Sequence, residues 1–322
     1  MIERGSDGVA EELLGGESTR RAQLEARKSC LTPDQARQYE ELVRGTKAGR
    51  VPGAIPRRSP GATRPLSFSQ ERLWFLQQLH PADRSNIRSV AVRLSGELDV
   101  AFLEASLTEI SGRHEVLRAV FDNAGGSPRE RITPVRTIEL RVEDCSNLAD
   151  VERELRTRAI LRDGLWELID LNTGPILRGT LVRWGTEDHI LLLVTHRIVF
   201  DAWSAEILVD ELLALYGHRA GGPRSELPPL PISYADYACW QRERVDAGAL
   251  DESLAYWEST LRDMPGRVEL PLDRPRRPMP EGDGACERLH LCPHLVRSLQ
   301  SLARSERTAL YSVLLASFAV LI

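Results

Sequence analysis

Ile190-Leu-Leu-Leu-Val-Thr-His196-Arg197-Ile-Val-Phe-Asp201-Ala202-Trp203-Ser204 is the most informative segment of the chain. Its apolar run from Ile190 to Val194 has no polar alternation, which predicts a strand buried on both faces. The run ends in a histidine, and an amphipathic helix follows Asp201. We therefore expect His196 at a sheet edge, where a rigid strand can present polar groups to a substrate.

Working outward from this strand, the pattern predicts an alternation of strands and helices. We expect strands at 90–94, 116–121 and 138–142, and a hairpin of 176–182 with 189–194 around Gly185. We expect helices at 70–79, 100–113, 151–161 and 203–216. Gly164 is expected to stop the helix at 151–161. Mixed strands and helices of this kind predict an α/β (α+β) sandwich, with helices largely covering one face of the sheet.

The two ends of the chain differ from this middle part. Residues 1–60 are interpreted as a docking or linker segment, in which a short helix starts with the capping pattern at Thr32 and a proline-rich stretch follows. The main lobe is placed at 61–235 and the start of a second lobe at 236–322. In that second part we expect a strand at 287–291 and helices at 294–305 and 309–322, the last of them apolar on nearly every face.

Composition excludes several classes of protein. The 322 residues carry a formal net charge of −5 and no massed basic stripe, so a nucleic-acid partner is not expected. The five cysteines show no pairing framework, and the sequence shows no leader. It also has no apolar run of about 20 residues, the length that spans a bilayer. These observations favour the cytoplasm over a membrane. Cys286, His290, Cys292 and His294 match no common zinc spacing, so no metal site is predicted.

Several further stretches, in order along the chain, accompany the core stretch. They are Ser67–Leu76, Arg113–Phe121, Leu171–Arg178, Tyr234–Gln241, Tyr256-Trp257 and Leu270–Pro275. Together they resemble the motifs of condensation domains of nonribosomal peptide synthetases, which are related to chloramphenicol-acetyltransferase-like acyltransferases. The resemblance implies a chloramphenicol-acetyltransferase-like lobe plus an incomplete second lobe, with a substrate tunnel between them. It makes this sequence the N-terminal portion of such a domain.

The resemblance also assigns roles to the core residues. The family motif is His-His-x-x-x-Asp-Gly, so His196 matches the first histidine, and Arg197 stands where the family has its catalytic histidine. Ala202 replaces the glycine, and Trp203 follows it. An arginine stays protonated and cannot serve as a general base, which predicts weak or absent catalysis, although it could still donate hydrogen bonds to an oxyanion.

His196 and Asp201 are expected to be structural. Asp201 either favours the positive end of the helix that follows it, or forms the salt bridge that the family makes with an arginine located beyond Ile322. The aromatic residues Tyr234, Tyr237, Trp240, Tyr256 and Trp257 are interpreted as core residues rather than as a stacking platform.

The resemblance implies substrates carried by other proteins. In the family, an amine on a downstream peptidyl carrier protein attacks an acyl thioester on an upstream one; both substrates hang from 4′-phosphopantetheine arms, and no cofactor is bound. Residues 1–60 would dock to an upstream synthetase. Two alternatives stay open: a non-catalytic recruitment module, like the glycopeptide-synthetase domains with the same arginine that bind oxygenases, and a stand-alone acyltransferase using soluble thioesters.

Overall fold

The computed structural model describes residues 54–59, 61–123, 128–223, 227–266, 270, 272, 275 and 289–322. These residues belong to two compact units, divided between Leu250 and Asp251. Most of the predicted docking segment, 1–60, lies outside the described residues. The predicted lobe boundary at 235 stays a prediction, because the division at Leu250 separates packed units and not lobes as such.

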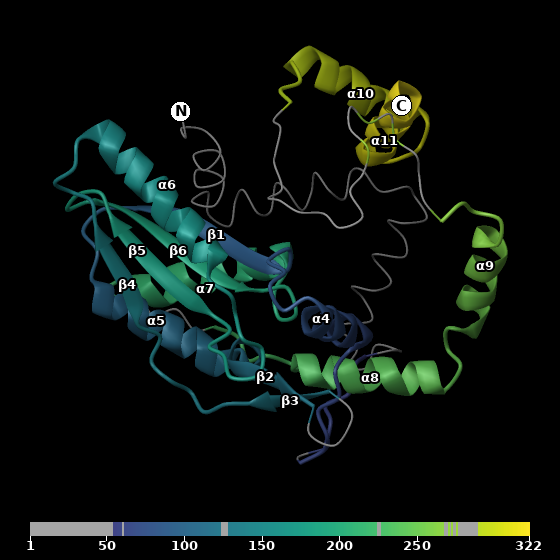
Figure 1. The fold of residues 1–322 in the computed structure, drawn as a ribbon, viewed down its shortest axis with the longest axis horizontal. Helices are drawn as coiled ribbons and strands as arrows, with labels where there is room; N and C mark the ends of the chain where they lie inside the picture. The colour runs from purple at the N-terminus through teal and green to yellow at the C-terminus, as the bar shows by residue number, and fades with distance from the viewer. Residues whose placement is uncertain are drawn as a thin grey trace. The chain divides into compact units, whose positions relative to one another are not determined.

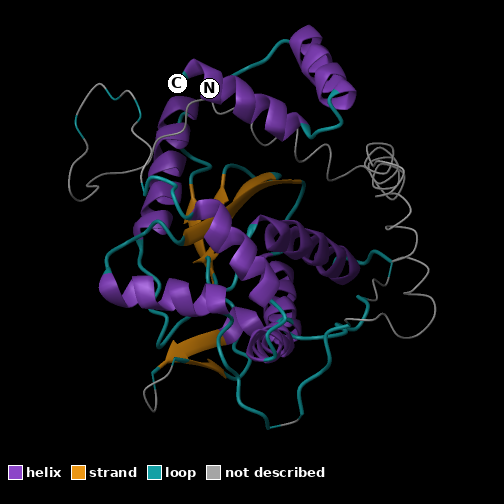
Figure 2. Ribbon diagram, turned by 90° about the vertical axis from the view of Figure 1, so that its right-hand side faces the viewer, coloured by secondary structure: helices purple, strands orange, loops and turns teal. Residues whose placement is uncertain are grey.

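The first unit is built on a four-stranded sheet with the order β1-β6-β5-β4 (Figure 1). The strands are β1 (Ile87–Ser95), β4 (Leu140–Asp144), β5 (Arg178–Arg183) and β6 (Asp188–His196). β6 is antiparallel to both of its neighbours, and β4 and β5 are parallel. The predicted hairpin around Gly185 is thus confirmed. A second sheet pairs β2 (Ala119–Asp122) with β3 (Arg129–Ile132), and Figure 2 shows the two sheets as separate groups of strands.

Helices cover both faces of the larger sheet. They are α4 (Phe68–Leu79), α5 (Val100–Arg113), α6 (Asp150–Trp166) and α7 (Ala202–Arg219). Leu191 and Leu193 of β6 pack with α5 and α7, whereas Leu192 and Val194 pack on the opposite face with side chains of α4 and α6. Figure 1 shows α5 and α6 on opposite sides of the sheet. The expectation of one covered face was therefore wrong, because an unbroken apolar strand needs cover on both sides.

Two local expectations also differ from the structure. Residues Glu115–Arg118 form a 3₁₀ turn, so the strand predicted from 116 begins only at Ala119. Helix α6 does not stop by Gly164 but continues to Trp166. A Cβ added at Gly164 would lie 2.9 Å from Leu192 Cδ2. This glycine therefore serves the close approach of α6 to β6 rather than the end of the helix.

The first unit ends with helix α8 (Tyr234–Asp246), which contacts the N-terminal end of α4. The backbone N–H of Phe68 donates to Oε1 of Gln241 at 3.1 Å, and Arg242 Nε donates to the Leu66 carbonyl at 2.6 Å. Ser67 and Ser233 form capping boxes that start α4 and α8. Both helices thus begin with their first backbone N–H groups satisfied.

The second unit contains α9 (Asp251–Leu261), α10 (Pro293–Ser305) and α11 (Leu310–Leu321). The helices predicted at 294–305 and 309–322 correspond to α10 and α11, which contact each other. The predicted strand at 287–291 falls partly outside the described residues, and Leu289 to Leu291 form none. Within the described ranges, no helix combines the length and apolar character needed to cross a bilayer.

Large apolar side chains of this unit are exposed. Val320 and Leu321 on α11 are 88% and 82% exposed, in line with the helix predicted to be apolar on nearly every face. Tyr256 and Trp257 on α9 are 62% and 55% exposed. The interpretation of these two aromatic residues as core residues was therefore wrong for the structure described, because α9 buries none of its residues.

The packing of β5 gives a first prediction. Gly179 is buried, and a Cβ at this position would lie 2.3 Å from Leu140 Cδ2 and 3.3 Å from Leu193 Cδ2. We expect Gly179→Ala to lower the free energy of unfolding by about 1–3 kcal/mol through overpacking. The matched control is Gly185→Ala in the β5–β6 turn, where a Cβ meets nothing within 4 Å. Urea unfolding curves that shift equally for both variants would contradict this account.

Candidate functional site

His196 ends strand β6 inside the core. The residue is only 1% exposed, although it is the last residue of its strand. Its Nδ1 accepts a hydrogen bond from the backbone N–H of Ile198 at 3.1 Å, which places the proton of the neutral ring on Nε2. That Nε2 is buried and has no hydrogen-bond partner among the residues described. The ring is therefore held as a structural acceptor.

The surroundings of His196 keep its ring neutral. Burial, assisted by the positive charge of Arg88, lowers the pKa of His196 from 6.5 to about 4, and the carboxylate of Asp83 opposes this shift only in part. A base with so low a pKa takes up a proton weakly at neutral pH. At neutral pH the ring of His196 is therefore uncharged.

Arg197 is the first residue of the core stretch to leave the interior. Its backbone N–H donates to the Asn86 carbonyl at 2.7 Å, just before β1. Its side chain is exposed, and no other described residue gives it a hydrogen bond or an ion pair. The backbone of Arg197 is thus fixed while its guanidinium is exposed.

The next residue, Ile198, is held by both of its backbone polar groups. Its N–H binds His196, and its carbonyl accepts a hydrogen bond from Gln70 Nε2 at 3.3 Å. Gln70 is 2% exposed, and its Oε1 accepts from the backbone N–H of Ser67 at 3.1 Å. The Ser67 hydroxyl in turn lies 3.1 Å from the Tyr234 hydroxyl. Two motifs that lie far away in the sequence therefore position the loop between His196 and Asp201, which is called the core loop below.

Asp201 caps the helix that follows the loop. Its Oδ1 accepts from the Ser204 backbone N–H at 2.8 Å and from the Ser204 hydroxyl at 2.7 Å. These hydrogen bonds lower the pKa of Asp201. Its carboxylate forms no ion pair within the described part of the chain and lies at the start of α7, the position that the helix-dipole alternative describes.

Ala202 and Trp203 open helix α7. Among the described residues other than glycine, only Arg307 has a positive φ, so Ala202 is not strained in the place of the family's glycine. Trp203 is 65% exposed. The structure therefore brings His196, Arg197, Asp201, Ala202 and Trp203 together around one strand–loop–helix connection. Their catalytic or structural roles stay predictions.

A buried ion-pair cluster links the second motif to α7. Glu211 is 8% exposed, and its two oxygens meet Arg113 Nε at 3.0 Å and His114 Nε2 at 2.7 Å. Arg113 and His114 stand at the end of α5. The cluster therefore locks α5 and α7 together beneath the sheet that carries the core motif.

Sequence reasoning missed three of these positioning residues. The Ser67-x-x-Gln70 spacing is a capping-box signal, and it could have marked Gln70 as a buried amide. The residues one helical turn from Glu211 on α7 are apolar, which is a signal for a buried acid with a partner; they are Ile207, Leu208, Ala214 and Leu215. Asn86 acts through its backbone carbonyl, so its side chain gives no signal.

The described residues contain no group of three side chains that could hold a metal ion. Cys286, one of the four residues weighed for zinc, lies outside them. The site is therefore built from an exposed cation, a buried imidazole and fixed backbone groups.

The family described as "Condensation domain" matches residues 62–322. Phosphinothricin tripeptide synthetase PhsC of Streptomyces viridochromogenes is 36% identical over 300 residues. The match covers 93% of this chain but 28% of that synthetase, so the chain spans less than a third of that relative's length.

Solved structures agree with this match. The complex of the X-domain and OxyB from teicoplanin biosynthesis has a TM-score of 0.61 and 29% identity, over 72% of this chain and 50% of that one. SgcC5 from Streptomyces globisporus has a TM-score of 0.66 and 28% identity, over 80% of this chain and 59% of that one.

The clamp on Ile198 gives a second prediction. Gln70→Leu leaves the Ile198 carbonyl and the Ser67 N–H without their partner, so we expect the free energy of unfolding to fall by about 2–3 kcal/mol. Amide exchange at Ile198 should accelerate more than at core amides of β5. The matched control is Gln77→Leu on the same helix, where the amide bonds an exposed carbonyl. A uniform rise in exchange would speak against a local clamp.

The depressed pKa of His196 gives a third prediction. Between pH 6.5 and about 4, only the unfolded chain protonates this histidine, so the free energy of unfolding falls as the pH drops through this window. We expect His196 to contribute a loss of roughly 3 kcal/mol. Replacing it with His196→Asn, which keeps an acceptor, should flatten the pH dependence of unfolding by that amount. Parallel curves for the two proteins would refute the assignment.

Proposed function

Because the chain belongs to the condensation-domain family of nonribosomal peptide synthesis, we propose that it forms amide bonds slowly, by positioning its substrates without a general base. In the reaction, the amine nitrogen attacks the thioester carbonyl carbon. The carbon–sulfur bond breaks, the thiol leaves, and the amine gives up a proton. A general base would accept that proton.

One observation carries the proposal: neither residue at the histidine pair can take the proton at neutral pH. His196 is buried, uses Nδ1 as an acceptor and has a pKa of about 4. Arg197 holds the other position with a guanidinium, which stays protonated. The proton must therefore leave to solvent or to the thiolate product, which supports a slow reaction.

The remaining contributions are positioning and charge. The backbone of residues 197 and 198 is held by hydrogen bonds to Asn86, His196 and Gln70. A rigid loop of this kind supports alignment of two tethered reactants, which by itself contributes strongly to rate. The exposed guanidinium of Arg197 can donate to the oxyanion that develops at the thioester carbonyl.

The proposal includes the delivery of both substrates by other proteins. We expect upstream and downstream peptidyl carrier proteins with 4′-phosphopantetheine arms as partners, residues 1–60 as a docking segment, and a cytoplasmic location. The impairment is proposed for this chain only.

A second candidate is a recruitment module that carries no chemistry. Two observations favour it: Arg197 at the catalytic position, and the 29% identity to an X-domain solved in complex with OxyB. In this case the exposed Trp203 and Arg197 would contact a tailoring oxygenase instead of a carrier arm. The two candidates differ in whether restoring a base restores chemistry.

Replacement of Arg197 gives a fourth prediction. With the sequence joined to the C-terminal half of a condensation domain from a relative, Arg197→His should raise the rate of amide formation between two loaded carrier proteins by roughly 100-fold or more. Mass spectrometry of the product measures the rate. Arg162→His, on an exposed position of α6, is the matched control and should leave the rate within about twofold.

The outcomes separate the candidates. Equal rates for the parent and Arg197→His would overturn the proposed impairment. If neither forms amide although both fold and bind carriers, an oxygenase pull-down then tests the recruitment candidate. Turnover of coenzyme A thioesters without any carrier would favour the stand-alone acyltransferase.

A further inference from the structure

A cavity of about 510 Å³ lies at the β5–β4 end of the larger sheet, the end opposite to β1. Its walls are β2, α6, the start of β5 and the extended segment 133–139. This volume falls in the range of small-molecule sites. His196 and Arg197 do not line the cavity, so it is separate from the core motif.

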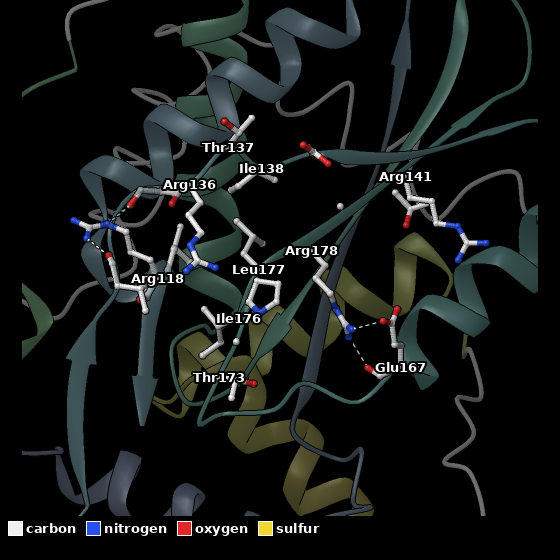
Figure 3. Close-up of a pocket in the computed structure, with 18 of the residues that line it drawn as sticks. Arg118, Arg136, Thr137, Ile138, Arg141, Glu167, Thr173, Ile176, Leu177 and Arg178 are labelled. Atoms are coloured by element: carbon white, nitrogen blue, oxygen red, sulfur yellow. Dashed lines mark hydrogen bonds and ion pairs between the residues drawn. The ribbon is translucent and has the colours of Figure 1, made fainter. Parts of the chain in front are cut away.

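Part of the wall of the cavity is apolar, and the rest is polar. Ile138, Ile160, Ile176 and Leu177 line it, and the last three are buried. Figure 3 shows Ile176 and Leu177 side by side at its centre. An apolar wall of this kind favours a ligand with a hydrocarbon body.

Three of the four arginines that line the cavity are already bound. Arg178 pairs with Glu167 at 2.8 Å, and Arg141 pairs with Glu143 at 2.7 Å. Arg118 donates to backbone carbonyls at the end of α5 and in the segment 133–139. Figure 3 shows Arg178 turned toward Glu167 and Arg141 turned away from the cavity. These three guanidinium groups therefore have structural partners.

Arg136 differs from the other three. Across the described part of the chain it has no hydrogen bond and no ion pair. Its backbone is fixed on either side, because Thr133 N donates to the Arg118 carbonyl at 3.0 Å and Ile138 N donates to a threonine hydroxyl of α5 at 2.9 Å. Figure 3 shows its side chain reaching between Arg118 and Leu177 into the cavity.

The carboxylates around the cavity leave Arg136 unneutralised. Three carboxylates line the cavity: Glu167 is committed to Arg178, Asp163 lies 3.7 Å from the neighbouring Arg162, and Glu139 has no ion pair among the described residues. No described carboxylate lies within ion-pair distance of Arg136. A free guanidinium beside an apolar wall is the arrangement that recognises an amphipathic anion.

We propose that this cavity binds an apolar carboxylic acid, whose carboxylate is held by Arg136 and whose hydrocarbon part lies on Ile138, Ile176 and Leu177. The planar fork of one guanidinium matches one carboxylate in a bidentate geometry. A carboxylate also carries the single charge that one arginine neutralises. The site is independent of the function proposed above.

Calorimetric titration of the chain with 4-phenylbutanoate tests the site, with 4-phenylbutanamide as the uncharged isostere. We expect the carboxylate to bind, and the amide to bind at least about tenfold more weakly. Arg136→Gln should weaken carboxylate binding by about tenfold or more. Arg141→Gln, on the same rim but paired with Glu143, is the matched control and should leave binding within about twofold.

Methyl resonances of Ile176 and Leu177 locate the bound acid, and thermal unfolding shows that both variants fold. Shifts confined to these methyl groups and lost in Arg136→Gln support the proposal. Equal binding of acid and amide, equal effects of the two substitutions, shifts located elsewhere, or no binding at millimolar acid would each overturn it.

Discussion

The burial of β6 on both faces is the constraint on which the first unit depends. Leu191 and Leu193 face α5 and α7, while Leu192 and Val194 face α4 and α6. Because each face of the strand must be covered, helices are required on both sides of the sheet, and the loop after the strand is brought to the sheet edge. Gly164 and Gly179, next to these side chains, lack the Cβ atoms for which there is no room.

The end of this strand separates two residues with opposite surroundings. His196 is still enclosed and 1% exposed, so desolvation favours its neutral form. Arg197, one position later, has left the strand, and its charge is solvated. A histidine at position 197 would share this exposed position. Arginine in place of histidine at position 197 therefore changes the chemistry available there, and it does so at a position where the fold itself needs no particular side chain.

The loop between β6 and α7 is rigid because its backbone is bound from several elements. Asn86 before β1, Gln70 on α4 and His196 at the end of β6 hold residues 197 and 198. Asp201 then starts α7 with a capping box. Ser67 and Tyr234 connect this arrangement to α8. The separate motifs of the sequence thus meet as one hydrogen-bonded support for the core loop.

Local elements of the first unit can be derived from the amino-acid sequence alone. The apolar run at 190–194, the Gly185 turn and the cap at Asp201 encode a strand, a hairpin and a helix start, because periodicity and capping act between near neighbours. Only the tertiary structure decided that α6 passes Gly164, that Gln70 binds Ile198, that Glu211 joins α5 to α7 and that Arg136 faces a cavity. These contacts join residues far apart in the chain, and their energies depend on burial, which no local pattern contains.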